Sequence, residues 1–409
     1  MQQRLAWLKV RDPRSFLCMM GMMCCVFTAV GFWSPLMSVY TGELGANVSQ
    51  IGIVLATFQA TSLASQYWWG RRSDKIGRRK PLLLVGTAGL AIAYLIIALI
   101  TSWQWIIPAR MLEGLVLAAY NTSSLAMIGD LLEGNEHRGR LMGLYRMCGS
   151  LAFSIASLAG GSLAEIYSIR LPFMIASGAY VLAFIIACFI REQATSKPAA
   201  KSEQVPPEQA GAPSAIGAVS QRALWSFMLL SFTWSSGMGA VASFWPYFMN
   251  SIGYTTAQVG QLWALTAMCE VVWLMVVGWV AERLGSKNVM IFGVMMMSTI
   301  FFSYTLATSF LWFVLIQLVR AIAYSCFETP SLLYATELGL RQHRGRLAGL
   351  FYSATGIGGI IGAALGGRLA DWFGMVGMFR IVVVFMLSVA VLLIFLMPSS
   401  RKQALAHEQ

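Results

Sequence analysis

The chain of 409 residues is 57% hydrophobic and only 11% charged, with a mean hydropathy of +0.67. A soluble fold of this composition would expose far too much apolar surface, so a soluble globular protein is excluded. Apolar runs recur along the whole chain, and each can cross a hydrocarbon core of about 30 Å as a helix of roughly 20 residues. The composition therefore predicts a membrane protein with many spans.

The net charge of +12 is distributed unevenly between the connections. Of the 29 Lys and Arg residues, 23 lie at the two ends and in the connections of one face, whereas three lie on the opposite face. Basic residues collect on the cytoplasmic side of membrane proteins. This bias predicts that both termini are cytoplasmic, in a cytoplasmic (inner) membrane. The positive charge is therefore explained by topology, and a nucleic-acid-binding surface is excluded.

Twelve spans are expected, in two sets of six. The first set covers residues 14–41, 48–70, 81–100, 105–132, 138–165 and 171–191. The second set covers residues 223–250, 256–282, 289–307, 310–337, 344–371 and 376–398.

Between the two sets lies the only sizeable polar stretch, which is rich in Pro, Ala, Gln, Glu and Lys. Such a composition cannot bury a core and indicates a flexible cytoplasmic linker. We therefore expect an all-α membrane protein with an N-terminal six-helix bundle at 1–191, a linker at 192–220 and a C-terminal six-helix bundle at 221–409.

The two sets of spans resemble each other in register. Residues 49–52 (SQIG) open the second span and residues 257–260 (AQVG) open the eighth, 208 positions later. His137-Arg138-Gly139-Arg140-Leu141 recurs as His343-Arg344-Gly345-Arg346-Leu347. Several such matches, in the same order and at offsets of 206–208 positions, indicate a duplicated six-helix unit.

A ten-residue motif in the loop between spans two and three resembles a known family signature. Residues 70–79 read GRRSDKIGRR, which matches the G-x-x-x-D-[RK]-x-G-R-[RK] signature of the major facilitator superfamily. Arg72 stands where that signature usually has an apolar residue. The resemblance covers nearly the whole chain and implies a transporter that works by alternating access, with two six-helix repeats.

Within that superfamily the chain is most similar to the twelve-span drug/proton antiporter branch. That branch has R-x-x-x-G in its fourth span, and residues 110–114 read RMLEG here. Its fifth-span element G-P-x-x-G-G is only partly present, because Gly160-Gly161 are kept and the proline is missing. The resemblance implies proton-coupled export.

Charged residues at the cytoplasmic ends of the spans are candidates for a gate. Asp74 ends the second span, where the positive start of the eleventh helix should face it. Arg78 and Arg79 can pair with Asp74 or with Asp130 at the end of span four. Ion pairs that form in one conformation of the transporter and break in the other shift the equilibrium between the two conformations. The candidate gate residues are Asp74, Arg78, Asp130, Glu282 and Glu337.

Ionisable groups inside the spans are the candidates for binding substrate and protons, because each costs roughly 2.5–3.5 kcal/mol at bilayer depth on insertion scales. Glu113 follows Arg110 by three residues, so the two can meet on one helix face. Glu328 follows Arg320 by eight residues, about 12 Å along the axis, and cannot touch it. In this family the helix of Glu270 packs beside that of Arg146. The candidate substrate or proton site comprises Arg110, Glu113, Asn121, Glu270, Arg320 and Glu328.

Three functions fit these features. The first is a secondary active transporter for proton-coupled efflux of amphipathic or cationic small molecules. The second is an uptake carrier or facilitator for a metabolite or organic anion, with Arg110 and Arg320 gripping the anion, and the third is a lysolipid flippase. The three His residues lie in loops and the tail, and no G-x-x-x-x-G-K-[ST] loop is present, so we expect no enzyme, metal site or cofactor. The expected partners are a small-molecule substrate, protons and the lipid bilayer, and we expect a monomer.

Overall fold

The computed structural model describes residues 12–76, 78–132, 138–191, 221–337 and 344–398, and every regular element in these ranges is a helix. The chain forms two compact units. Unit 1 comprises Met1–Gly45, Thr57–Gln204 and Met249–Ala264, and unit 2 comprises Ala46–Ala56, Val205–Phe248 and Leu265–Gln409. The boundaries expected around the linker stay a prediction, because 192–220 lies outside the described residues.

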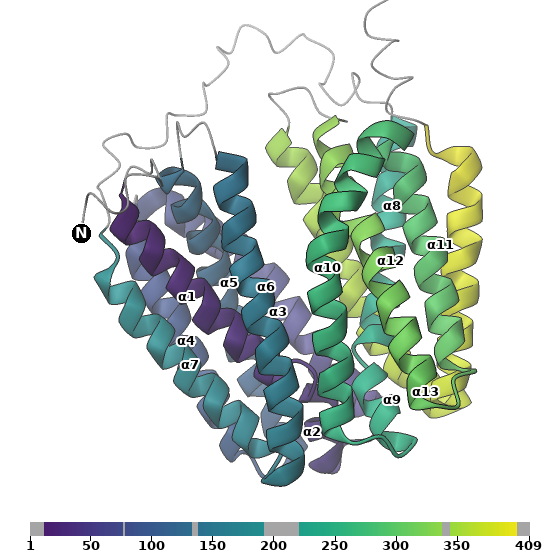
Figure 1. The fold of residues 1–409 in the computed structure, drawn as a ribbon, viewed down its shortest axis with the longest axis horizontal. Helices are drawn as coiled ribbons and strands as arrows, with labels where there is room; N and C mark the ends of the chain where they lie inside the picture. The colour runs from purple at the N-terminus through teal and green to yellow at the C-terminus, as the bar shows by residue number, and fades with distance from the viewer. Residues whose placement is uncertain (1–11, 77, 133–137, 192–220, 338–343, 399–409) are drawn as a thin grey trace, which may run out of the picture. The chain divides into compact units, whose positions relative to one another are not determined.

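Unit 1 is built on the first half of the chain (Figure 1). In it α1 packs against both α6 and α7, and α4 packs against α5 and α7. The short α2 continues the path of the first span after a break at Pro35. The helices of this half are α1 (Pro13–Trp33), α2 (Met37–Glu43), α3 (Val48–Ile76), α4 (Lys80–Leu99), η2 (Trp103–Trp105), α5 (Ile106–Leu131), α6 (Arg138–Ile166) and α7 (Arg170–Phe189).

Unit 2 repeats this construction with the second half of the chain. Its longest helix, α13, packs against α8, η4 and α11, and α11 packs against α12. The helices are α8 (Gln221–Gly237), the π-helical turn η4 (Met238–Ala242), α9 (Trp245–Ser251), α10 (Thr256–Leu284), α11 (Ser286–Tyr304), α12 (Phe310–Glu337) and α13 (Arg344–Leu396).

The twelve expected spans correspond to eleven apolar helical segments in the described residues. The discrepancy lies in α13, which has 53 residues and would be about 80 Å long if it were straight. Gly374 interrupts it with φ 72° and ψ 166°, a backbone conformation that is open to glycine and strained for other residues. This break divides α13 into the eleventh and twelfth spans, and the all-α fold of twelve spans is confirmed.

In each half, a lysine at the start of the third span caps the C-terminal end of the sixth span. Lys80 Nζ donates to the Cys188 carbonyl oxygen at 2.7 Å, and Lys287 Nζ donates to that of Ile394 at 2.9 Å. Carbonyl groups in the last turn of a helix lack intrahelical donors, and a cation there also complements the helix dipole. The duplication therefore preserved a cap as well as a sequence motif.

The repeated glycines mark close helix crossings within each unit. In unit 1 a Cβ at Gly260 of α10 would lie 2.5 Å from the Ser157 carbonyl oxygen of α6. In unit 2 a Cβ at Gly52 of α3 would lie 2.6 Å from the Ala363 carbonyl oxygen of α13. These are the glycines of the repeated SQIG and AQVG segments, so their recurrence reflects the same backbone approach made twice.

The glycines spaced every four residues in α13 face the first span of the second half. A Cβ at Gly358 would lie 2.5 Å from the Phe232 carbonyl oxygen, and one at Gly366 would lie 2.9 Å from Ala240 Cα. Between them, a Cβ at Gly362 would overlap the Ser236 carbonyl group. The spacing of four residues therefore forms a helix-packing seam along one face of α13.

We expect Gly362→Ala to lower the free energy of unfolding by about 1–3 kcal/mol, because the added methyl group forces α8 and α13 apart. Gly349→Ala is the matched control, since a Cβ there meets nothing within 4 Å. Alanine at that exposed helical position should be neutral or slightly stabilising. The stability of both variants is measured by thermal unfolding in detergent. Equal losses of stability in the two variants would contradict the close approach of α8 and α13 at Gly362.

Candidate functional site

The first intramembrane arginine forms a buried ion pair within its own helix. Arg110 and Glu113 lie three residues apart on α5, with Nη1 and Oε2 2.5 Å apart, and their side chains are 2% and 0% exposed. The Tyr94 hydroxyl of α4 donates to Glu113 Oε1 at 2.5 Å. Both carboxylate oxygens therefore accept a hydrogen bond, and the pairing predicted from the spacing is confirmed.

Aromatic rings enclose this pair. The Arg110 guanidinium carbon lies 4.1 Å from the ring centroid of Phe58 and 5.3 Å from that of Trp33. The rings of Tyr94 and Tyr180 stack 5.3 Å apart beside it. Rings over the guanidinium supply cation–π attraction where water is excluded. The pair is thus internally neutral and joins α5 to α1, α3 and α4.

We expect Glu113→Gln to destabilise the protein by about 3–5 kcal/mol, because it leaves Arg110 as an uncompensated buried charge. The Arg110→Gln/Glu113→Gln double variant removes both charges and should be more stable than Glu113→Gln alone. Thermal unfolding of the three proteins in detergent checks the coupling. A double variant less stable than Glu113→Gln would show that the two charges do not stabilise each other.

The second half neutralises its arginine with a different set of groups. Arg320 of α12 occupies the place of Arg110 in the repeat, but Ala323 stands where Glu113 would be. Arg320 is 5% exposed, and its charge acts on half-buried Glu270 of α10. The charge of Glu328, also on α12, acts on Glu270 as well. Within unit 2 a cation near Glu270 is therefore Arg320. The expected packing of the helix of Glu270 beside that of Arg146 is present within unit 1, where Gly260 of α10 crosses Ser157 of α6.

Uncharged polar groups extend this cluster. Gln317, one turn before Arg320 and fully buried, accepts hydrogen bonds at Oε1 from Thr266 of α10 at 3.0 Å and Tyr304 of α11 at 3.4 Å. Its amide nitrogen has no hydrogen-bond partner in the described part of the chain. These contacts tie α10, α11 and α12 together and leave one donor open. We call Glu270, Gln317, Arg320 and Glu328 the α10–α12 cluster.

Two other residues predicted inside the spans lie apart from the Arg110–Glu113 pair. Asn121 is exposed on α5, eight residues and about 12 Å along the axis beyond Glu113. Arg146 is exposed on α6. The structure therefore leaves the first-half pair without an additional polar ligand from these positions.

One of the two gate pairings left open by the sequence is present. Arg79 Nη1 lies 3.0 Å from Asp130 Oδ2, and both side chains are partly exposed. Arg78 is exposed beside it, and Glu282 is exposed on α10. Two further predicted gate residues belong to helices, but their side chains lie outside the described part of the structure: Asp74 and Glu337.

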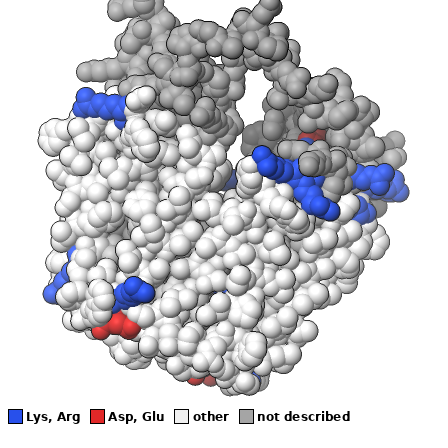
Figure 2. All heavy atoms as spheres, turned by 180° about the vertical axis from the view of Figure 1, so that it is seen from behind, with Lys and Arg blue, Asp and Glu red and all other residues white. Residues whose placement is uncertain are grey.

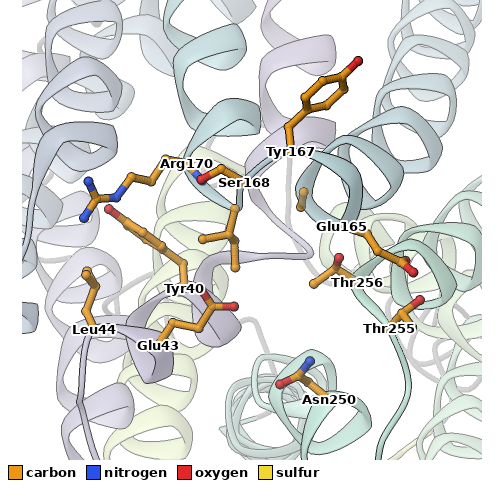
Figure 3. A pocket seen from close by; sticks show the side chains of 12 residues that line it. Tyr40, Glu43, Leu44, Glu165, Tyr167, Ser168, Arg170, Asn250, Thr255 and Thr256 are labelled. Atoms are coloured by element: carbon orange, nitrogen blue, oxygen red, sulfur yellow. The ribbon is translucent and has the colours of Figure 1, made fainter.

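A cavity of about 520 Å³ opens at the helix ends that the charge bias predicts to be external. Figure 3 shows the Glu43 carboxylate directed into it, while the Arg170 guanidinium turns toward the Tyr40 hydroxyl. Partial burial raises the pKa of the Glu43 carboxyl. Glu165 also lines the cavity and accepts a hydrogen bond from the Ala257 backbone N–H at 3.3 Å. The lining of the cavity therefore includes two carboxylates and one guanidinium group.

Sequence reasoning missed the tyrosines that complete both clusters. Tyr94 lies 19 residues before Glu113, and Tyr304 lies 13 residues before Gln317. A tyrosine inside an apolar span needs a partner for its hydroxyl, and this was the available signal. Thr266 gave no signal, because a threonine in a helix usually bonds to its own backbone.

A duplicated helical fold with ionisable groups inside its spans is the construction of a secondary transporter. The family model of the Major Facilitator Superfamily matches residues 19–337 and 237–409. The chain belongs to the major facilitator superfamily.

The chain is similar to several curated members of that superfamily. An uncharacterized MFS-type transporter of Methanocaldococcus jannaschii is 24% identical over 363 residues, 89% of this chain and 93% of that protein. Multidrug resistance protein 2 of Bacillus subtilis is 22% identical, covering 87% and 88% of the two chains. The class D tetracycline resistance protein of Salmonella ordonez is 28% identical, covering 77% and 78%. These relatives agree with the predicted position near the drug/proton antiporter branch.

Solved structures share the fold. The crystal structure of the nucleoside transporter NupG has a TM-score of 0.77 at 14% identity, covering 93% of this chain and 98% of that one. The peptide transporter POT in complex with sulfate has a TM-score of 0.75 at 14% identity and covers 94% of both chains. At this identity the likeness concerns the fold alone.

Proposed function

We propose that the protein is a proton-coupled exporter of small amphipathic cations that works by alternating access. The observation behind this proposal is that Glu270 of α10 lies within electrostatic range of one arginine and a second carboxylate, both on α12. The multidrug and tetracycline resistance proteins among its relatives support the same class of cargo.

The charges around Glu270 suggest how protons and cargo compete. Two neighbouring carboxylates repel each other when both are ionised, and Glu328 acts on Glu270 in this sense. Either a proton or a cationic substrate relieves that repulsion, so the two ligands exclude each other at the α10–α12 cluster. A site that alternates between the two sides of the membrane then exchanges one for the other. The open Gln317 amide supplies a donor for a polar group of the substrate.

The first-half pair has a different role in this scheme. Arg110 and Glu113 neutralise each other, and Tyr94 occupies the remaining carboxylate oxygen. We therefore assign Arg110 and Glu113 to holding unit 1 together. An organic-anion carrier that grips its substrate with both Arg110 and Arg320 would need Arg110 to be available, and the ion pair with Glu113 argues against that alternative.

The remaining features follow from the same scheme. The Arg79–Asp130 pair would act as part of a cytoplasmic gate together with Asp74, Glu282 and Glu337. We further propose that the protein is a monomer in the inner membrane, that both termini and 192–220 are cytoplasmic, and that it moves its cargo without chemical change or a cofactor.

Uptake of ethidium by proteoliposomes with an acidic interior tests this function. We expect Glu270→Gln and Glu328→Gln each to lower gradient-driven uptake about tenfold or more, the factor that corresponds to about 1.4 kcal/mol. The reason is that neither variant can exchange a proton at that position. Asp371→Asn removes an exposed carboxylate of α13 outside the cluster and should leave uptake unchanged.

The anionic dye fluorescein distinguishes the alternative carrier. Wild-type uptake of fluorescein that is lost in Arg320→Gln and kept in Glu270→Gln would favour an organic-anion carrier. Ethidium uptake that is unchanged when the pH gradient is collapsed would contradict proton coupling.

A further inference from the structure

Two arginines at the end of α3 lie over exposed aromatic rings. The guanidinium carbon of Arg71 is 4.5 Å from the ring centroid of Tyr67, and that of Arg72 is 5.6 Å from the ring centroid of Trp68. Tyr67 is 65% exposed and Trp68 is 50% exposed. The apolar segment of α3 ends at Arg72, so the stacked pairs occupy its last turns.

The next tryptophan fixes the rotation of α3 that turns these rings outward. Trp69 is 9% exposed, and its Nε1 donates to the Leu115 carbonyl oxygen of α5 at 2.8 Å. It belongs to a buried cluster with Leu82, Ala118 and Ala119. With Trp69 anchored inside unit 1, the neighbouring Trp68 and the arginines one turn on face away from the packed helices.

The second repeat makes a similar arrangement within unit 2. Arg283 lies 3.7 Å from the ring centroid of Trp279, which is 53% exposed, near the end of α10. All three pairs have the same spacing, with the aromatic residue four positions before the arginine. Figure 2 shows Lys and Arg side chains in a few groups on a surface that is otherwise largely white.

The stacked geometry leaves the hydrogen-bonding edges of these guanidinium groups open. Stacking uses the flat face, and the N–H groups point along the edges in a fork that matches phosphate oxygens. In the part of the chain that the structure describes, Arg71, Arg72 and Arg283 form no hydrogen bond or ion pair with their side chains. Exposed Trp and Tyr at the end of a span lie at the level of lipid headgroups.

We propose that the end of α3 is a binding site for the headgroup phosphate of an anionic phospholipid, held by Arg71 and Arg72 and flanked by Tyr67 and Trp68. Arg283 with Trp279 forms a smaller site of the same kind at the end of α10. These ends lie on the side that the charge bias predicts to be cytoplasmic, where anionic lipids attract juxtamembrane cations. Arg72, which departs from the family signature, thereby gains a role in lipid recognition.

Electron spin resonance of the full chain in phosphatidylcholine bilayers tests the site. The measured quantity is the association constant of spin-labelled phosphatidylglycerol relative to that of spin-labelled phosphatidylcholine. We expect Arg71→Gln/Arg72→Gln to lower this selectivity by roughly fivefold for each arginine removed at the site. Tyr67→Leu/Trp68→Leu keeps both charges and should give a smaller loss, because the guanidinium groups are no longer held in place.

The matched control is Arg368→Gln/Arg380→Gln, which removes two exposed arginines elsewhere on α13 and gives the same net charge. Selectivity should remain in this control. Equal losses in both double variants would show a net-charge effect and overturn the site, as would unchanged selectivity in Arg71→Gln/Arg72→Gln. Displacement of the label by inorganic phosphate, but not by chloride of equal ionic strength, would support recognition of the phosphate group, and equal displacement by both would overturn it. Thermal unfolding of each variant confirms that it is folded.

Discussion

A charge inside a bilayer needs an opposite charge or a water-filled cavity within reach, because hydrocarbon cannot solvate it. In this chain the arginine of the fourth span and its counterpart in the tenth both meet that requirement, by different means. Arg110 forms an ion pair with Glu113, whose other carboxylate oxygen accepts a hydrogen bond from Tyr94, and two aromatic rings cover its guanidinium group. Arg320 lies within electrostatic range of Glu270, and so does Glu328. The first arrangement is neutral in itself, whereas the second contains two carboxylates around one arginine.

The duplication preserved the features that hold helices together. Lysines cap the sixth span of each half, and glycines let the same helix pairs approach closely in both units. The chemistry inside the spans diverged, because Ala323 replaces the glutamate that would have locked Arg320. In our proposal the Arg110–Glu113 pair stabilises the first half, whereas the second half, with Ala323 in place of that glutamate, exchanges ligands. This difference explains why a duplicated fold can have an asymmetric site.

The sequence predicted those features that depend on spacing along one helix. The twelve spans, the Arg110–Glu113 pair and the seam at Gly358, Gly362 and Gly366 all follow from helical periodicity and apolar length. The partners of Glu270 did not follow, because which faces of α10 and α12 meet depends on how the helices rotate about their axes. Tyr94 was missed for the same reason. The sequence did place a break between 371 and 376, and Gly374 makes that break in the longest helix with φ 72°.

The central claim is that a proton and a cationic substrate exclude each other at the α10–α12 cluster. It is tested most directly by the number of protons released when purified protein in weakly buffered detergent solution binds tetraphenylphosphonium. The account predicts release of about one proton per bound cation in the wild type and in Asp371→Asn, and none in Glu270→Gln/Glu328→Gln. Binding without proton release in the wild type, or release that persists in Glu270→Gln/Glu328→Gln, would contradict it.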